Sequence, residues 1–496
     1  MKILNPLPLV TLILLKFFLF VSCRSQETHP QGFARIKDGK ISVNDTVFHV
    51  VAINYRINLR QDSAGNYFPN RGLGYEPNSK FSYRNPQDCL NEIRKDFLLC
   101  KEMGYNTVRV VGIGEANIVN QKSPNPKVYY AAFVTENYLQ EVDFRNAQQW
   151  NNFQSAISQV LDIASEIGVK IIFTTKLLPN IPMLDEMLES TVKYHKGRNE
   201  ILAYDFLNEP LYFDSVEHSK KEIYLATRNW NRIVKNNSPH LTTIGLACQR
   251  ELFVWDPNVV DVDFISFHPY EYEKNQVISE IYWYSKFVNK PWILGETGIP
   301  ADNDSIPYSA QVDFAKKTLY QEMNCNGNGY SWWQYKDVYW DSFHQTYLGV
   351  VNHKDSTLLS NGEYVHGTPK DLGKNLPFLL TSYQKSTCQC PDNYYNFSEN
   401  TYFSIKGKVV NEDGKPIEGA GILAWDEFWV NHYFTTTRAD GTFELFSDYK
   451  FYHWMVSALE HDKVYLHFNP DNAVLIENTL TLEMGEMKLK EVDLGD

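Results

Sequence analysis

The sequence predicts an α/β fold, a (β/α)8 TIM barrel followed by a small all-β sandwich. Eight short apolar runs alternate with helical patterns over about 340 residues, which is the pattern of parallel βαβ units closed into a barrel. The chain has 496 residues, 43% of them hydrophobic, so it is long enough for more than one core. A doubly wound open sheet is the alternative, but no glycine-rich phosphate loop follows the first strand.

The predicted strands share short apolar runs bounded by turn signals, and the predicted helices share apolar residues at helical spacing. The strands are 46–54, 106–112, 169–175, 201–207, 241–247, 262–267, 292–296 and 327–333. The helices are 86–103, 146–167, 184–195, 217–235, 278–288, 309–323 and 370–383. Unusually long connections follow strands one, two and eight, at 55–85, 113–145 and 334–369. All three belong to the C-terminal face of a barrel, so we expect them to wall a cleft.

Residues 1–22 are expected to be a signal peptide. Lys2 precedes an apolar run over residues 9–21 that only Thr11 and Lys16 interrupt. The run ends in FVSC, which resembles a bacterial lipoprotein cleavage box with Cys23 as the lipidated residue. The prediction is an exported protein in the bacterial periplasm or at the cell surface, held to the membrane through Cys23. Simple secretion, with Cys23 incidental, is the alternative.

Composition changes divide the mature chain into four parts. They are a tether at 23–44, the barrel at 45–385, a linker at 386–400 and a β-sandwich at 401–496. In the last part, GKVVNEDGKPIEGAGILAWDE followed by TTTRADGTFEL resembles carboxypeptidase regulatory-like domains. That resemblance implies a sandwich architecture and no chemistry. The expected role of this domain is a spacer that lifts the barrel off the membrane.

Charge and cysteine spacing exclude several classes of partner. A net charge of -13 gives no basic surface for phosphate, so nucleic acid is excluded as a partner. Cys89 and Cys100 lie roughly 16 Å apart along one predicted helix, too far for a mutual disulfide. Cys388 and Cys390 are too close together for a common zinc pattern. We expect no metal and no cofactor, and the sequence leaves open a disulfide from the 388–390 pair.

Two glutamates follow predicted strands at positions suited to catalysis. The run ILAYDFLNEP at 201–210 reaches Pro210, which cannot continue a central strand, so Glu209 lies at the C-terminal tip of strand four. Strand seven, WILGE, ends at Glu296. The C-terminal tips of barrel strands face the active site. Tips on opposite sides of a small barrel can converge across its axis.

Together with FHPY at 267–270, Arg109 in strand two and WW at 332–333, these motifs resemble glycoside hydrolase family 5 and its clan of barrel glycosidases. The resemblance covers about residues 45–385. It implies that Glu209 is the acid/base and Glu296 the nucleophile of a retaining mechanism, which needs two carboxyl groups about 5–5.5 Å apart. We expect the site to push their pKa values apart, with one group protonated and the other ionised.

The same resemblance implies roles around the two acids. Asn208 would bind the sugar 2-hydroxyl, His268 would line the acid/base side, and Trp333 would lie under the reacting ring. Arg109 fits as the cation that keeps Glu296 charged, and Tyr270 as a hydrogen-bond donor to the same carboxylate.

Several alternatives remain open for these residues. Arg109 also fits a structural ion pair and His268 a core histidine. Strand alternation sends only one of Trp332 and Trp333 into the barrel, and Trp333 is preferred. Strand three ends FTTK at 173–176, where many family members carry a histidine.

The predicted function is a secreted or lipid-anchored retaining β-glycoside hydrolase acting on a β-linked glycan of the mannan or glucan type. One alternative is a transglycosylase that uses the same site. Another is a non-catalytic, glycan-binding surface lipoprotein that uses the cleft or aromatic residues of the sandwich such as Trp425, Trp429 and Trp454.

Overall fold

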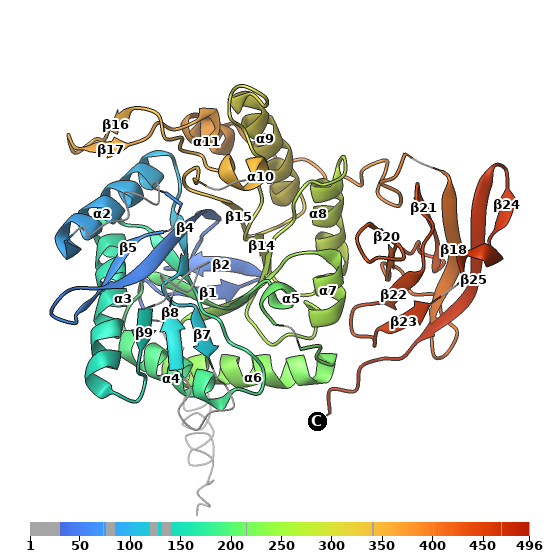
Figure 1. The fold of residues 1–496 in the computed structure, drawn as a ribbon, viewed down its shortest axis with the longest axis horizontal. Helices are drawn as coiled ribbons and strands as arrows, with labels where there is room; N and C mark the ends of the chain where they lie inside the picture. Colours follow the sequence, from blue (N-terminus) through green and yellow to red (C-terminus); the bar gives the residue numbers. More distant parts are fainter. Residues whose placement is uncertain are drawn as a thin grey trace, which may run out of the picture.

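The computed structural model describes residues 30–495 apart from 73, 76–84, 120–126, 131–139, 215, 340–341, 400 and 468. The predicted signal peptide and Cys23 lie outside the described residues. Eight parallel strands form a closed barrel, because the last strand pairs with the first (Figure 1). They are β4 (Val50–Gln61), β6 (Thr107–Gly112), β10 (Lys170–Thr174), β11 (Ile201–Asn208), β12 (Leu241–Leu246), β13 (Ile265–Phe267), β14 (Trp292–Leu294) and β15 (Gly329–Trp332). The predicted fold class and all eight strands are confirmed.

Seven long helices surround the barrel at the predicted places. They are α2 (Pro86–Glu102), α3 (Ala147–Ile167), α4 (Pro182–His195), α6 (Lys220–Asn237), α8 (Gln276–Phe287), α9 (Tyr308–Asn324) and α11 (Asp371–Ser382). Local signals fix their ends: Asn85 caps α2 before Pro86, and Ser219 forms a capping box with Glu222 in α6. Three short helices were not predicted, α5 (Pro210–Phe213), α7 (Gln249–Trp255) and α10 (Phe343–Thr346). No helix among the described residues is long and apolar enough to cross a membrane.

The three long connections carry strands of their own. β4 continues past its predicted end at Asn54 and turns back through β5 (Tyr67–Arg71), which pairs with it antiparallel. β7 (Ala116–Val119), β8 (Lys127–Tyr130) and β9 (Gln140–Val142) form a small sheet after β6. β16 (Ser356–Leu358) and β17 (Tyr364–His366) form a hairpin after β15. These additions all follow C-terminal strand ends, so they stand on the face that holds the two glutamates.

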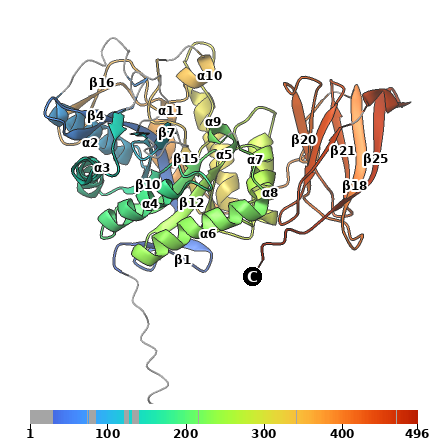
Figure 2. The ribbon, with the colours of Figure 1, turned by 60° about the horizontal axis from the view of Figure 1, so that its bottom comes forward.

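Part of the predicted tether belongs to the barrel instead. β1 (Ala34–Lys37), β2 (Lys40–Val43) and β3 (Thr46–Val47) form a sheet under the N-terminal ends of the barrel strands (Figure 2). Ala34 and Ile41 are buried in one apolar cluster with Val50, at the start of β4. The Ile41 amide also donates to Asn328 Oδ1 at 3.1 Å. The tether prediction is therefore wrong for residues 34–43, whose alternating apolar side chains close the bottom of the barrel.

The C-terminal domain is a sandwich of two four-stranded sheets, as predicted. One sheet has the order β21-β18-β25-β24 and the other β20-β19-β22-β23. The strands are β18 (Phe403–Asn411), β19 (Gly421–Trp425), β20 (His432–Thr436), β21 (Thr442–Ser447), β22 (His453–Ser457), β23 (Val464–His467), β24 (Val474–Ile476) and β25 (Thr479–Leu489), with a 3-10 turn at Pro470–Asn472. Phe403, Val409, Phe443 and Trp454 fill the space between the sheets.

The sandwich packs directly against the barrel, beside α7 and α8 (Figures 1 and 2). Leu423, Trp425 and Met455 of its β20-β19-β22-β23 sheet belong to the same apolar cluster as the barrel core. Nζ of the buried Lys220 lies 2.8 Å from Asp256 Oδ2 and donates to the carbonyl of Ala458 at 2.7 Å. This packing does not fit the expected spacer, because apolar side chains and the hydrogen bond from Lys220 to Ala458 fix the domain to the barrel.

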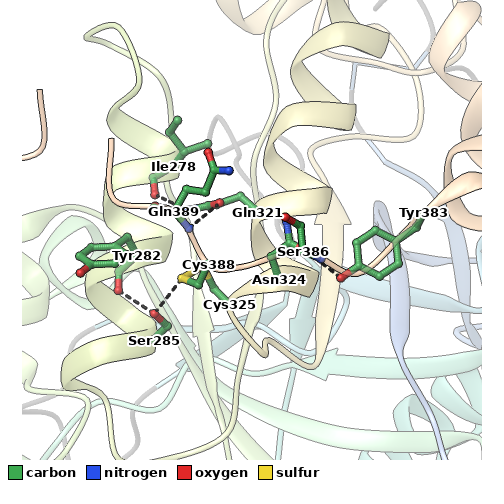
Figure 3. The surroundings of a disulfide bond; sticks show 10 residues. All are labelled: Ile278, Tyr282, Ser285, Gln321, Asn324, Cys325, Tyr383, Ser386, Cys388 and Gln389. Carbon is green, nitrogen blue, oxygen red and sulfur yellow. Dashed lines mark hydrogen bonds between the residues drawn. A yellow bond between two sulfur atoms is a disulfide. The ribbon is translucent and has the colours of Figure 1, made fainter. Parts of the chain in front are cut away.

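A disulfide fastens the linker to the barrel (Figure 3). Cys388 of the linker bonds Cys325, the C-cap of α9, 63 residues earlier. Next to it, Gln321 Nε2 donates to the Gln389 carbonyl at 2.6 Å. The sequence left open a disulfide from the 388–390 pair and did not identify a partner, because Cys325 ends a helix that only the folded barrel brings close.

Candidate active site

Glu209 and Glu296 converge at the C-terminal mouth of the barrel. Glu209 directly follows β11 with a left-handed backbone (φ 46°), and its amide donates to the Gly245 carbonyl of the next strand. Glu296 lies two residues beyond β14. One carboxylate oxygen of each glutamate and Nδ1 of His268 all lie within 4.8 Å of one another. The two carboxylates predicted at strand tips therefore lie close together.

Arg109 lies at the centre of the barrel mouth, fully buried, and bonds four side chains. Its Nη1 donates to Glu296 Oε1 at 2.5 Å and to Asn54 Oδ1 at 2.9 Å. Nε and Nη2 donate to Asp205 Oδ2 at 2.9 and 2.7 Å, and Nη2 also donates to Asn208 Oδ1 at 2.7 Å. Both interpretations of Arg109 hold, since it forms a structural ion pair with Asp205 and also binds Glu296.

Asn54 and Asp205 were not among the site residues predicted from the sequence. A signal existed for Asp205: it is a charged residue within the apolar run ILAYDFL, and a buried charge needs a partner. Asn54 ends an apolar run in the same way. Its Nδ2 donates to the carbonyl of Gly295, next to Glu296, at 3.0 Å. These two residues hold Arg109 and the backbone beside Glu296 in place.

Tyr270 and His268, from the loop after β13, contact the two acids. Tyr270 donates its hydroxyl to Glu296 Oε2 at 3.0 Å. His268 Nδ1 lies 3.1 Å from Glu209 Oε1 and 3.7 Å from Glu296 Oε1. Burial lowers the pKa of His268 to about 4, so the ring is neutral near pH 7. His268 is thus a buried histidine that also touches both carboxylates.

Burial raises the pKa of both glutamates. For Glu209 the positive charge of Arg109 opposes this rise. For Glu296 the charge of Arg109 and the hydrogen bond from Tyr270 oppose it, whereas the negative charge of Glu209 adds to it. Burial acts on the two carboxyls in the same direction, so their predicted difference in pKa rests on their other contacts. Their surroundings do differ, because Glu296 accepts hydrogen bonds from Arg109 and Tyr270 and its side chain is 5% exposed, against 23% for Glu209. Donors stabilise an ionised carboxylate, and solvent contact suits a group that exchanges protons.

The two adjacent tryptophans face different ways. Trp332 is fully buried and donates Nε1 to the Leu348 carbonyl at 2.8 Å. Trp333 is half-buried, and the Arg56 guanidinium lies 5.0 Å from its ring centroid. The Trp333 amide donates to the carbonyl of Thr297, the neighbour of Glu296, at 2.9 Å, so Trp333 lies on the Glu296 side of the mouth. Sequence reasoning placed Arg56 in a loop, because it ended strand one at Asn54.

At the end of strand three, a threonine and a glutamate occupy the region where many members of the resembling family carry a histidine. The Thr174 hydroxyl lies within hydrogen-bond distance of two acceptors, the Val110 carbonyl at 2.8 Å and Glu115 Oε1 at 3.0 Å. Glu115 is buried, and burial raises its pKa. Its position in the long connection after β6 gave no signal in the sequence.

A cavity of about 370 Å³ opens on the Glu209 side of the site. Glu209, His268 and Tyr270 of the barrel line it, and so do Phe397 of the linker and Phe434 of β20. The cavity therefore lies between the barrel mouth and the sandwich, a boundary that no sequence pattern predicted.

Three possible metal ligands converge in the site, one atom each from Glu209, His268 and Glu296. Glu296 Oε1 already accepts from the guanidinium of Arg109 at 2.5 Å. A fixed cation at that distance repels a second one and occupies the lone pair that a metal would need. The donor set therefore fits a metal poorly.

No family model and no curated protein matches the chain. Among solved structures it is similar to an exo-β-1,4-mannosidase, Op5Man5, from Opitutaceae bacterium strain TAV5. The identity is 16% and the TM-score 0.42, over 66% of this chain and 61% of that one. It is also similar to a family 1 β-glucosidase from Thermotoga maritima, at 12% identity and a TM-score of 0.40, over 67% of this chain and 97% of that one.

Proposed function

We propose that this chain is a retaining β-glycoside hydrolase with Glu296 as nucleophile and Glu209 as acid/base. The observation that carries the proposal is the approach of the two carboxylates, with oxygens within 4.8 Å of each other. Retaining enzymes hold their carboxyl groups about 5–5.5 Å apart, whereas inverting enzymes hold them about 6.5–9.5 Å apart to admit a water molecule. The short separation favours direct attack by one carboxylate.

In the first step, Glu296 attacks the anomeric carbon while Glu209 donates its proton to the glycosidic oxygen, and the bond between these two atoms of the substrate breaks. In the second step, Glu209 takes a proton from water, whose oxygen attacks the anomeric carbon and releases Glu296. Arg109 and Tyr270 hold Glu296 ionised and oriented for the attack. The more exposed Glu209 exchanges its proton with the leaving group and with water.

The substrate we propose is a neutral β-linked glycan of the mannan or glucan type. In this proposal Trp333 supplies an apolar face for a sugar ring, and Asn208, whose Oδ1 accepts from Arg109 at 2.7 Å, binds the 2-hydroxyl. We also propose that the protein is exported and anchored through Cys23. A disulfide between Cys325 and Cys388 suits an oxidising compartment.

The sandwich gives little support to a purely glycan-binding protein. Of the three tryptophans considered for that role, Trp454 lies in the domain core and Trp425 is buried at the barrel interface. Trp429 is 48% exposed, but its ring stacks on His453 at 4.0 Å between centroids. The convergent acids of the barrel carry the proposal instead.

The experiment is hydrolysis of β-mannan, β-glucan, xylan and aryl β-glycosides by the purified chain beside its Glu296→Ala variant. Loss of the nucleophile should reduce kcat by about 10³-fold or more on whichever substrate the wild type cleaves. Glu186→Ala, at an exposed position of α4, is the matched control and should retain full activity. A wild type that binds glycan but cleaves nothing would contradict the proposal.

A further inference from the structure

We infer that the C-terminal sandwich is part of the active site, in which β20 and Phe397 form the wall that receives a neutral sugar leaving group. The inference rests on the proposed roles of Glu209 and Glu296. It begins with the 370 Å³ cavity, because this space is lined by the acid/base on one side and by His432, Tyr433 and Phe434 on the other. Its volume falls within the range of about 300–1,000 Å³ that is typical of small-molecule sites.

The lining indicates which part of the substrate the cavity takes. Among the described residues that line it, Glu209 is present, whereas Glu296 and Trp333 are not. The sugar that becomes bonded to the enzyme must lie over Glu296. The group that leaves must lie beyond the acid that protonates it. The cavity extends from Glu209 toward the sandwich, so it lies on the leaving-group side.

The wall formed by β20 and Phe397 is held in place by contacts with the linker and with the barrel. The ring of Phe434 lies 5.0 Å from that of Phe397, and Phe434 packs against the apolar cluster of the barrel. The neighbouring Thr435 donates its hydroxyl to the Tyr395 carbonyl at 2.6 Å. From the barrel, Trp283 Nε1 donates to the Gly419 carbonyl at 3.1 Å. Contacts on both sides thus fix β20 relative to Glu209.

The charge and surface of the lining favour a neutral sugar. Glu209, Glu273 and Glu280 face the cavity, and the described lining contains no lysine or arginine. A leaving group with a carboxylate, phosphate or sulfate would therefore find no compensating cation in this lining. Tyr272 and Phe434 add aromatic surface, which sugar rings pack against. These features together describe a subsite for an uncharged sugar residue.

The test compares two substrates that differ only in the leaving group. Cellobiose and mannobiose place a sugar beyond Glu209, whereas β-glucosyl fluoride and β-mannosyl fluoride release an ion too small to reach β20. In His432→Ala and Phe434→Leu, kcat/KM should fall by about tenfold on the disaccharide that the wild type cleaves and stay unchanged on the matching fluoride. Phe428→Ala is the control, because Phe428 is 76% exposed on the same domain and does not line the cavity.

Two results would overturn the inference. Equal losses on the disaccharide and the fluoride would mean that the substitutions disturb the reacting centre or the fold, and unchanged disaccharide kinetics would mean that β20 does not contact the leaving group. Failure of the proposed function looks different, because the wild type would then cleave neither the disaccharides nor the fluorides. His432 is exposed, so its truncation does not depend on how the interface tolerates a change at Phe434.

Discussion

Nη1 of Arg109 lies 2.5 Å from Oε1 of Glu296, while the same guanidinium binds Asp205 with two further N–H groups. One cation therefore serves a structural partner and a proposed nucleophile. All three side chains are almost completely buried. Removing the cation leaves two buried carboxylates uncompensated, and this determines the first prediction.

Arg109→Ala should abolish measurable glycosidase activity and lower the free energy of unfolding by about 3–5 kcal/mol, because a buried ion pair loses one partner. Urea denaturation measures the loss. Arg35→Ala, which breaks an exposed pair with Asp45, should cost less than about 1 kcal/mol. Similar stabilities for the two variants would contradict the central role of Arg109.

Tyr270→Phe should leave the fold intact and weaken catalysis, since it removes only the hydroxyl that donates to Glu296 at 3.0 Å. A hydrogen bond to a charged group is worth about 1.5–3 kcal/mol, so kcat/KM should fall by about 10- to 100-fold. Loss of the donor raises the pKa of Glu296. The acidic limb of the pH profile should therefore move to higher pH, a shift that a purely structural role would not produce.

The alkaline limb should belong to Glu209. Burial raises the pKa of this carboxyl, and the group must be protonated to act as an acid, so kcat/KM should fall as pH rises through that pKa. In Glu209→Ala the alkaline limb should disappear. A substrate with a good aryl leaving group should retain much of its rate of glycosylation, because it needs little protonation.

Azide provides an independent check on the same variant. In Glu209→Ala, azide should attack the glycosyl-enzyme, release Glu296 and yield a β-glycosyl azide, which product NMR identifies. An azide of α configuration would reverse the proposed roles of the two acids. The retained β configuration requires two displacements at the anomeric carbon.

Lys220→Ala should destabilise the whole chain, because it leaves the buried Asp256 carboxylate without its cation and removes the donor to the Ala458 carbonyl of the sandwich. We expect a loss of about 3–5 kcal/mol in the free energy of unfolding. Lys286→Ala breaks an ion pair that joins the barrel to the sandwich, with Glu418, in which about a third of each side chain is exposed. That control should cost less than about 1 kcal/mol.

Cys388→Ser should lower the free energy of unfolding by about 2–4 kcal/mol, the usual contribution of a disulfide that closes a long loop. Cys390→Ser is the matched control two residues away. Cys390 is a free, exposed thiol, so its loss should leave the midpoint of thermal unfolding unchanged. Equal midpoints for both variants would argue that Cys325 and Cys388 are not bonded in the isolated protein.

Local sequence patterns were sufficient to predict the barrel and the two acids. Each strand is a short apolar run, and Pro210 stops β11 so that Glu209 must lie at its tip. The partners of Arg109 were harder to find, because Asp205 and Asn54 are distant in sequence and meet it only inside the closed barrel. Arg56 was missed since β4 continues through polar residues that resemble a loop.

The packing of the sandwich against the barrel could not be predicted from the sequence, for a different reason. Strand alternation indicates that β19 and β22 each bury one face, but it does not distinguish the sandwich core from a surface of the barrel. Leu423 packs against the barrel core and Ile422 against the sandwich core, although both are aliphatic neighbours on one strand. Long-range packing decides between them, and no local pattern encodes it.

The sheet that closes the bottom of the barrel also places the start of the described chain at the end opposite the barrel mouth. β1 to β3 lie at the end of the barrel opposite Glu209 and Glu296, and the described chain begins there at Pro30. From Cys23 to Pro30 the chain reaches at most about 25 Å when fully extended. A lipid on Cys23 would therefore hold the barrel base-down on the bilayer, with its open mouth turned toward approaching polymer chains.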